Sequence, residues 1–540
     1  MNTTRRGFMQ QSAALGASSA APWLASLAAI GEASAQTLPN DYKALVCVFL
    51  AGGNDHANTM IPVDLSVDQL SKPGYDNYIQ YRPEIAYQWD ANKLGVNQPA
   101  DKTVDLIPRG DRSSLPGALN MDLVKNLVAT GVGLPAGRNF AFSPPLTELK
   151  KLYDNKQLAV VLNVGTLVEP TIGFRDPGNG SFSYFAYKAD GSIDNTRQAL
   201  LPPRLGSHND QQLVWQSFKP EGASNGWGGK IADTTGGSPG NRVFSCISLA
   251  GNNVYLTGDL TLPYQVTSAS SLSVPLGNLR TSVYGSAACA NVLGQIITGQ
   301  GLGTTSQSLL EKDLTAVVRR SISADDVLRN MPRLEGDGTY TNLNVICDPY
   351  NGIDLARQLR TVAHLIRNRD KLGATTGRQV FFVQIFTFDT HSGQNAEHPW
   401  LLRQVSLSLD AFMKDISGMG MANQVTAFTA SDFGRTFNSN GDGTDHGWGG
   451  HHFVVGGAVK GGQFYGKAPT FVPNGPSAAG ANYRDEDNGR GRLIPSTSVT
   501  QYAATLASWM GVLDSQLPSV LPNISSFNIP GWGTKLGFMG

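Results

Sequence analysis

Short, almost unbroken apolar runs recur along the chain and are separated by polar, glycine-rich segments. The first occupies residues 43–50, and similar runs occupy residues 158–163, 380–386, 425–429 and 453–455. Runs of this length that are rich in β-branched and aromatic residues are typical of strands buried on both faces, as in a parallel sheet covered by helices. We therefore predict a strand at each of them.

Apolar residues at helical spacing follow several of these runs. Each stripe recurs at steps of three or four residues, which places its side chains on one face of a helix. The stripes are Leu355, Leu359, Val362 and Ile366; Leu401, Val405, Leu409 and Phe412; and Val499, Tyr502, Leu506 and Met510. The alternation of strands and helices predicts an α/β fold, a doubly wound and mostly parallel sheet flanked by helices.

Two regions depart from this alternation. Residues 170–205 and 218–345 are dense in Gly, Ser, Asn and Thr and contain only short alternating segments. We interpret them as insertions, or a cap, that carry β-hairpins and some helix. No repeat of fixed period stands out, so we assign residues 36–540 to one α/β domain with these insertions.

The first 35 residues have the pattern of an export signal. Thr4-Arg5-Arg6-Gly7-Phe8-Met9 is a twin-arginine motif, and Ala33-Ser34-Ala35 is a small-residue cleavage site. The segment between them is too short and too rich in Ala and Ser for a membrane span. We expect export by the twin-arginine translocase to the periplasm or the exterior, with no stable membrane anchor.

The charge balance and the cysteine spacing argue against several classes of protein function. The chain has 42 basic and 42 acidic residues, a balance that argues against a general nucleic-acid surface and gives no electrostatic case for membrane binding. The four cysteines, Cys47, Cys246, Cys289 and Cys347, lie far apart, which excludes zinc-finger and thioredoxin motifs. Cys47 lies within the first apolar run and is expected to pack in the core.

Polar clusters follow the apolar runs. They contain Asp55-His56, Ser207-His208 at the start of a predicted helix 208–217, Asp389 with His391, Asp432, and finally Asp445-His446 with His451-His452. Carboxyl ends of neighbouring parallel strands share one edge of a sheet, so these side chains are expected to converge there. Carboxylates and imidazoles bind zinc, manganese or calcium, and such a set can hold one or two divalent ions.

The candidate metal ligands are therefore Asp55, Asp389, His391, Asp432, Asp445, His446 and His452. Of the adjacent His451 and His452, only one can point inward from a strand. His364 falls opposite the apolar stripe of its helix and is expected at the surface, and His398 is expected to be a helix cap or surface group.

Two matched motifs and one absent motif argue against other classes of enzyme. Residues 222–226 match Gly-x-Ser-x-Gly, but no apolar strand precedes them, which argues against a lipase-type site. Residues 461–467 match Gly-x-x-x-x-Gly-Lys, but Ala468 replaces the Ser or Thr that binds magnesium. No Gly-x-Gly-x-x-Gly follows the first strand, so nicotinamide and flavin chemistry have no support.

The order of the polar clusters resembles the alkaline phosphatase superfamily of phosphatases, arylsulfatases and phosphodiesterases. The closer resemblance is to the exported domain-of-unknown-function family 1501, over about residues 40 to 515. It rests on Phe49-Leu-Ala-Gly-Gly-Asn-Asp55, Ser207-His208, Phe388-Asp-Thr-His391, Asp432-Phe-Gly-Arg435 and Gly443-Thr-Asp-His-Gly447. The resemblance implies an alkaline phosphatase-like fold.

It also implies roles for individual residues. Ser207 would be the nucleophile, and Arg435 would clamp an oxyanion. Asp389 and His391 would ligate one metal, Asp432 the other, Asp55 would bridge toward the second metal, and His446 would complete the set. Ser207 equally fits the N-cap of a helix.

Two departures from the superfamily pattern matter. Phe433 stands where the superfamily has His, so either His446 replaces the missing imidazole or one metal site is lost. The arylsulfatase signature is absent, since the nearest candidate, at residues 143–147, lacks its Arg. We predict an exported metal-dependent hydrolase of phosphate or sulfate esters acting on a small anionic ester. The alternative is a non-catalytic surface protein of the same fold that binds a metal or a glycan.

Overall fold

A computed structural model describes the part of the chain that follows the predicted export signal. The described residues are 41–63, 75–87, 127–129, 132–135, 138–219, 222–238, 241–266, 282–283, 285–298, 309–332, 334, 337–347, 353–469, 483–484 and 491–540. The predicted signal at residues 1–35 lies outside them. Within the described ranges, no helix combines the length and hydrophobicity that crossing a membrane requires.

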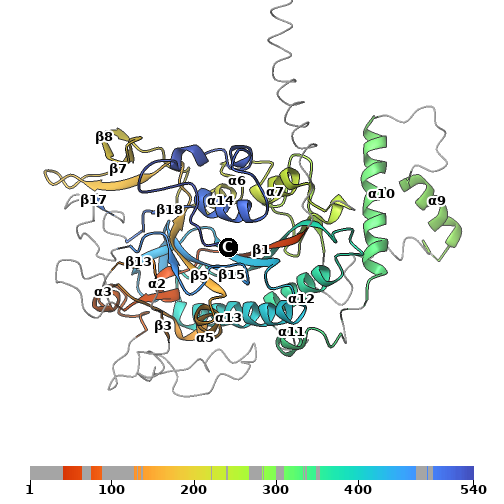
Figure 1. Ribbon diagram of the computed structural model, residues 1–540, viewed down its shortest axis with the longest axis horizontal. Helices are drawn as coiled ribbons and strands as arrows, with labels where there is room; N and C mark the ends of the chain where they lie inside the picture. The colour runs from red at the N-terminus through yellow and green to blue at the C-terminus, as the bar shows by residue number, and fades with distance from the viewer. Residues whose placement is uncertain are drawn as a thin grey trace, which may run out of the picture.

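A nine-stranded sheet forms the centre of the molecule (Figure 1). Neighbouring strands are parallel except β15, which runs antiparallel to both of its neighbours. In spatial order the strands are β10 (Tyr264–Gln265), β9 (Cys246–Ser248), β11 (Gly377–Ile385), β1 (Tyr42–Leu50), β12 (Val425–Ser431), β15 (Gly450–Gly456), β5 (Leu158–Gly165) and β16 (Phe464–Tyr465), with β18 (Thr497–Ser498) also paired to β5. The predicted strands are confirmed as β1, β5, β11, β12 and β15, and the mostly parallel sheet flanked by helices is confirmed.

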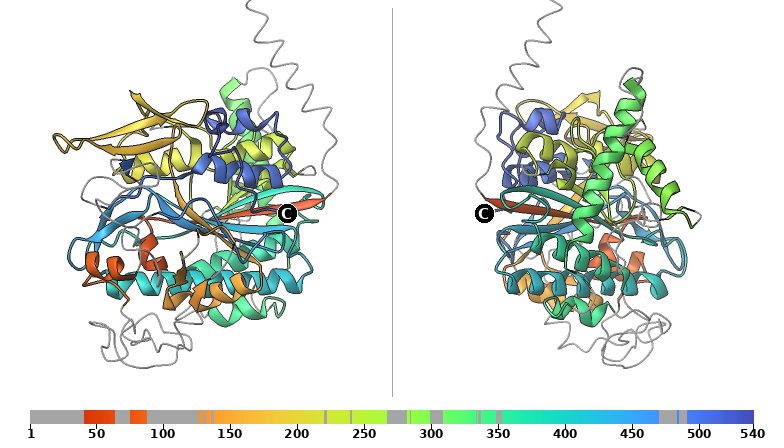
Figure 2. Two further views of the ribbon diagram at one scale, coloured as in Figure 1. Left: turned by 60° about the vertical axis from the view of Figure 1, so that its left-hand side comes forward. Right: turned by 90° about the vertical axis from the view of Figure 1, so that its right-hand side faces the viewer.

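Both faces of the sheet are covered by helices (Figure 2). Side chains of β1 alternate between two cores: Val46 and Val48 enter one, and Leu45, Cys47 and Phe49 enter the other. This alternation explains why β1 is apolar at every position from Ala44 to Leu50, because neither face of that stretch meets water.

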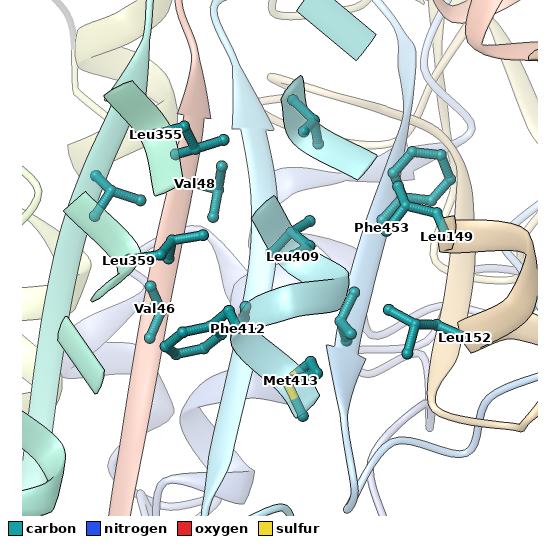
Figure 3. Close-up of a cluster of buried hydrophobic side chains, with 14 of the residues drawn as sticks. Val46, Val48, Leu149, Leu152, Leu355, Leu359, Leu409, Phe412, Met413 and Phe453 are labelled. Atoms are coloured by element: carbon teal, nitrogen blue, oxygen red, sulfur yellow. The ribbon is translucent and has the colours of Figure 1, made fainter. Parts of the chain in front are cut away.

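One face packs against α5 (Thr147–Asp154), α11 (Thr341–Ile346), α12 (Asp354–Arg367) and α13 (Gln394–Gly418). Figure 3 shows Leu355 and Leu359 of α12 beside Val46 and Val48, and Leu149 and Leu152 of α5 beside Phe453 of β15. The other face packs against α6 (His208–Ser217), α7 (Trp227–Thr235), α14 (Val499–Trp509) and α15 (Leu517–Val520). The three predicted helical stripes lie on α12, α13 and α14, and all are buried.

The glycine-rich regions divide between the periphery and the main sheet. Residues 170–205 supply β6 (Thr171–Arg175), β7 (Phe182–Tyr187) and β8 (Ile193–Gln198), which form a separate antiparallel sheet with β17 (Tyr483–Arg484). Residues 218–345 supply α9 (Ala287–Thr298) and α10 (Leu309–Arg329) at the periphery (Figure 1). They also supply β9 and β10, which extend the central sheet.

Smaller elements complete the described chain. The short helices are α2 (His56–Thr59) and α3 (Tyr75–Tyr81), with 3-10 turns η2 (Pro144–Leu146), η3 (Arg242–Phe244) and η4 (Ile524–Phe527). A three-stranded sheet contains β2 (Met60–Pro62), β4 (Phe140–Phe142) and β3 (Val128–Ala129), and a hairpin contains β13 (Arg435–Ser439) and β14 (Thr444–His446).

Two histidine predictions were wrong. His364 is fully buried on α12, with Nδ1 3.1 Å from the Tyr340 hydroxyl, because the chain leading into α11 covers the side that the stripe leaves open. His398 is buried as well, with Nε2 3.0 Å from Asn54 Oδ1, because α13 starts earlier than its apolar stripe suggests. Cys47 packs in the core as predicted, and none of the four cysteines forms a disulfide.

The loop after β1 approaches the loop after β11 so closely that only glycine fits. Gly52 has φ +117°, and a Cβ there would lie 2.3 Å from the backbone N of Asp389. We expect Gly52→Ala to destabilise the protein, because the backbone strain, worth about 1–3 kcal/mol, adds to a clash with main chain. Thermal unfolding measures the loss.

Gly222→Ala is the matched control. Gly222 also has positive φ, at +91°, but a Cβ added there would meet nothing within 4 Å. Gly52→Ala should lower the Tm more than Gly222→Ala does. Equal losses would show that close approach adds nothing at Gly52.

Candidate functional site

Side chains from four separate segments meet at the carboxyl edge of the central sheet. Asp389 follows β11, Asp432 follows β12, His446 ends β14, and His208 is the first residue of α6. His208, Asp389 and His446 each offer a ligand atom, and these three atoms lie within 4.8 Å of one another. The predicted convergence at one sheet edge therefore occurs for these four residues, and three of them form a possible metal-binding triad.

Three imidazoles present Nε2 to the carboxylate of Asp389. His446 Nε2 lies 3.1 Å and His391 Nε2 3.2 Å from Oδ1, and His208 Nε2 lies 3.4 Å from Oδ2. His391 and His446 also approach each other, with their Nε2 atoms 2.9 Å apart. His391 thus lies beside the triad and contacts two of its members.

The opposite nitrogen of each ring faces an acceptor. Nδ1 of His446 lies 2.7 Å from the Gly206 carbonyl oxygen, which can only accept, so this nitrogen carries the proton. Nδ1 of His208 lies 2.6 Å from Asp432 Oδ2, and Nδ1 of His391 lies 3.4 Å from Asp445 Oδ1. Such contacts are typical of metal-ligating histidines, because they direct the Nε2 lone pair toward the ion.

This arrangement can accept a cation. The His446 Nε2 lone pair faces His391 Nε2 across 2.9 Å and either accepts a hydrogen bond from that ring or is free to bind a metal when His391 is protonated at Nδ1. A cation would lie between these nitrogens and Asp389. Three imidazole nitrogens and one carboxylate oxygen fit zinc, manganese or iron, whereas calcium prefers an all-oxygen shell.

Burial and neighbouring charges shift the pKa values of the site residues in different directions. Partial burial alone would raise the pKa of Asp389, but the hydrogen bond and charge of Arg435 outweigh it and hold the pKa below its usual value. The hydrogen bond to Asp432 raises the pKa of His208, and burial lowers the pKa of His446. Asp389 is therefore ionised, as a metal ligand must be.

Arg435 holds Asp389 in place. The side chain is fully buried, and Nη1 donates to Asp389 Oδ1 at 2.5 Å and to the Gly52 carbonyl at 3.1 Å. Its other nitrogens donate to the carbonyl and hydroxyl of Thr444. The oxyanion clamp implied by the family resemblance would need a guanidinium that faces the substrate, whereas Arg435 orients a ligand.

Asp55 and Asp432 are buried, and both are hydrogen-bonded to other protein groups. Asp55 is fully buried, pairs with Arg82, accepts from Gln394 Nε2, and caps α2 by accepting from the backbone N of Ala57. Burial opposes its ionisation, but the charge of Arg82 lowers the pKa of Asp55 below its usual value.

Asp432 is also buried and has three donors of its own. Besides His208 Nδ1, it accepts from Gln212 Nε2 at 3.0 Å and from the backbone N of Gly52 at 3.2 Å. Both carboxylates that the resemblance assigns to a second metal thus already have protein partners.

Ser207 is the N-cap of α6. Its Oγ accepts from the backbone N of Asp210 at 3.4 Å. It lies directly between Gly206, whose carbonyl contacts His446, and His208. The hydroxyl is therefore adjacent in sequence to two residues of the site, while its geometry is that of a cap.

Phe433 forms an aromatic wall of the site. Its ring centroid lies 4.9 Å from that of His208 and 4.6 Å from that of His446. His446 lies 3.1 Å from Asp389 Oδ1, so an imidazole is present at the site although Phe433 stands where the superfamily has His.

His452 lies elsewhere. It is buried on β15, with Nδ1 3.3 Å from Thr429 Oγ1 and its ring edge-on to Trp215. His451 faces the opposite side of the strand, where Nδ1 accepts from the backbone N of Asn163. Neither ring reaches the triad, because adjacent residues of β15 point to opposite faces of the central sheet and both rings are buried there.

Sequence reasoning missed His208 as a ligand and Gln394 and Gln212 as supports. The signal for His208 was its position after Ser207 at a helix start, one of the polar clusters. No signal identified the glutamines, because their partners Asp55 and Asp432 lie hundreds of residues away.

Fold and site together define an α/β protein with a candidate metal centre at the carboxyl edge of a mostly parallel sheet. A family model described as a protein of unknown function (DUF1501) matches residues 372–478. The matched segment contains Asp389, His391, Asp432 and His446, while His208 lies before it. Among curated proteins, none matches this chain.

We expect Asp389→Asn to weaken binding of zinc or manganese at least about tenfold, because it removes the anionic ligand that the three imidazoles face. Metal content of the purified full chain and titration of the metal-free protein provide the measurement. The matched control is Asp514→Asn, an exposed carboxylate paired with Lys535. Unchanged affinity in Asp389→Asn would show that this cluster is not the metal site.

Proposed function

We propose that this protein is an exported, metal-dependent hydrolase of phosphate or sulfate esters. The observation that carries the proposal is the presentation of His208, His391 and His446 Nε2 to Asp389, with each Nδ1 facing an acceptor. A divalent ion held there would stabilise charge on the non-bridging oxygens of the ester and of the transition state.

The chain itself supplies a nucleophile and an anion-binding helix end. Ser207 Oγ would attack phosphorus or sulfur, the bond to the alcohol oxygen would break, and water would later release the Ser207 ester. The first backbone N–H groups of α6 and the positive end of its dipole favour the added negative charge. Arg435 keeps Asp389 ionised and fixed, and Asp432 orients His208.

We propose a single ion in this site. The Arg82 guanidinium already neutralises Asp55, which would otherwise need a second cation. Asp432 has three hydrogen-bond donors, and the Phe433 ring stands against His208 and His446. A second ion would have to displace these partners.

The alternative function is a non-catalytic surface protein that binds a metal or a glycan. The observation that favours it is the N-cap geometry of Ser207, whose Oγ accepts from Asp210 N. A protein of this kind would retain the metal site and lack turnover. The two proposals therefore differ in whether the metal-loaded protein turns over an ester.

The panel that separates them contains aryl phosphates, phosphodiesters and aryl sulfates, assayed with the metal-loaded protein. We expect turnover of one class, its loss on chelation and its return on adding metal. Ser207→Ala should lower kcat by about a thousandfold or more, because it removes the attacking atom.

The control is Asn209→Ala, an exposed position two residues further along the chain, in α6. It should leave kcat unchanged. Turnover that survives Ser207→Ala would eliminate the serine nucleophile, and bound metal without turnover of any ester would support the alternative.

We further propose that the protein reaches the periplasm or the exterior through the twin-arginine translocase. Arg5, Arg6 and the small residues 33–35 support this proposal. Replacing both arginines by lysine should retain the full-length chain in the cytoplasm, measured by cell fractionation and by the mass of the mature protein. Normal processing of that variant would contradict the proposed route.

A further inference from the structure

A groove of about 570 Å³ lies between α10, η3 and the segment that leads into β10. Leu260, Leu262 and Val317 line it and are 75%, 60% and 38% exposed. They are three of the nine large apolar side chains that are exposed among the described residues. Single exposed apolar residues are common in soluble proteins, but their concentration in one groove is typical of a binding site.

The exposure of the two leucines is built into the structure. Asp233 of α7 accepts hydrogen bonds from the backbone N of Asp259, of Leu260 at 3.1 Å and of Thr261 at 2.8 Å. A turn closes between the backbone N of Gly258 and the Thr261 carbonyl at 2.8 Å. Leu260 thus lies within a fixed turn and Leu262 directly follows it, so this side of the groove is organised before any ligand arrives.

The groove also carries unneutralised positive charge. Arg242 and Arg320 line it, both are exposed, and neither has an ion-pair partner within the described part of the chain. No acidic residue is among the described residues of the lining. Asp325, near Tyr264, is buried and paired with Arg329 at 2.7 Å.

We propose that this groove binds an anionic amphiphile. Arg242 and Arg320 would hold its carboxylate, sulfate or phosphate head, since guanidinium groups pair with such oxyanions through two parallel hydrogen bonds. Leu260, Leu262 and Val317 would cover its alkyl chain. The volume falls in the range of small-ligand sites, roughly 300–1,000 Å³.

The groove is separate from the candidate metal site. It lies beside α10 at the β10 edge of the sheet, whereas β13, which begins at Arg435, lies on the opposite side of the molecule (Figure 1). None of its lining residues belongs to the metal site. The proposal therefore does not depend on hydrolase activity.

The test is calorimetric titration of the full chain with dodecanoate, dodecyl sulfate and neutral dodecyl maltoside, each below its micelle concentration. We expect saturable one-site binding of the two anionic probes and at least about tenfold weaker binding of the maltoside. Arg320→Gln should weaken binding of the anionic probes about tenfold, and Leu262→Ser should weaken all three probes.

Two matched controls keep the test specific. Arg319→Gln changes an exposed neighbour on α10 that does not line the groove, and Leu513→Ser changes an exposed leucine elsewhere. Both should bind dodecanoate as the unaltered protein does, and all variants should keep its Tm. Equal affinity for the maltoside, or full affinity in Arg320→Gln, would overturn the proposal. So would a concentration-dependent dimer that Leu262→Ser abolishes while dodecanoate fails to bind.

Discussion

The buried guanidinium of Arg435 is the interaction on which the site depends. It donates to the Gly52 carbonyl after β1, to Asp389 after β11 and to Thr444 on β14. The loops after β1 and β11 are thereby hydrogen-bonded, through one side chain, to each other and to β14. A buried charge is costly unless it is paired and hydrogen-bonded, so the partners of Arg435 are required by its burial as much as by any chemistry.

A continuous polar network extends from this point into the core. Thr444 Oγ1 donates to Gln394, Gln394 donates to Asp55, and Asp55 pairs with the buried Arg82. The network explains why Asp55, a carboxylate at a strand end, does not lie among the metal-facing atoms. Its negative charge is matched inside the protein, and its neighbours keep the supporting shell of Asp389 rigid, as a preorganised site needs.

The candidate metal site and the proposed amphiphile groove are organised by different interactions within one fold. The site is built from side chains whose partners leave one nitrogen of each imidazole directed at a carboxylate. One side of the groove depends on the Asp233 carboxylate, which fixes the turn that carries Leu260 and precedes Leu262. In both regions, hydrogen bonds to neighbouring groups fix the imidazole rings or the turn before any ligand binds.

The sequence by itself determined the main strands, four of the helices and the neighbourhood of the site. Burial on both faces makes a strand apolar at every position, helical stripes repeat at local spacing, and parallel strands bring their carboxyl ends to one edge. Only the tertiary structure decided which polar residues face the candidate metal site and which support it. Asp55, Asp432 and His452 have the same chemistry as Asp389 and His446, and only contacts with residues remote in sequence, such as Arg82, His208 and Trp215, separate their roles. The same holds for Phe433, whose tilted ring contacts with His208 and His446 follow from the packing of α6 and β14 and not from any local pattern.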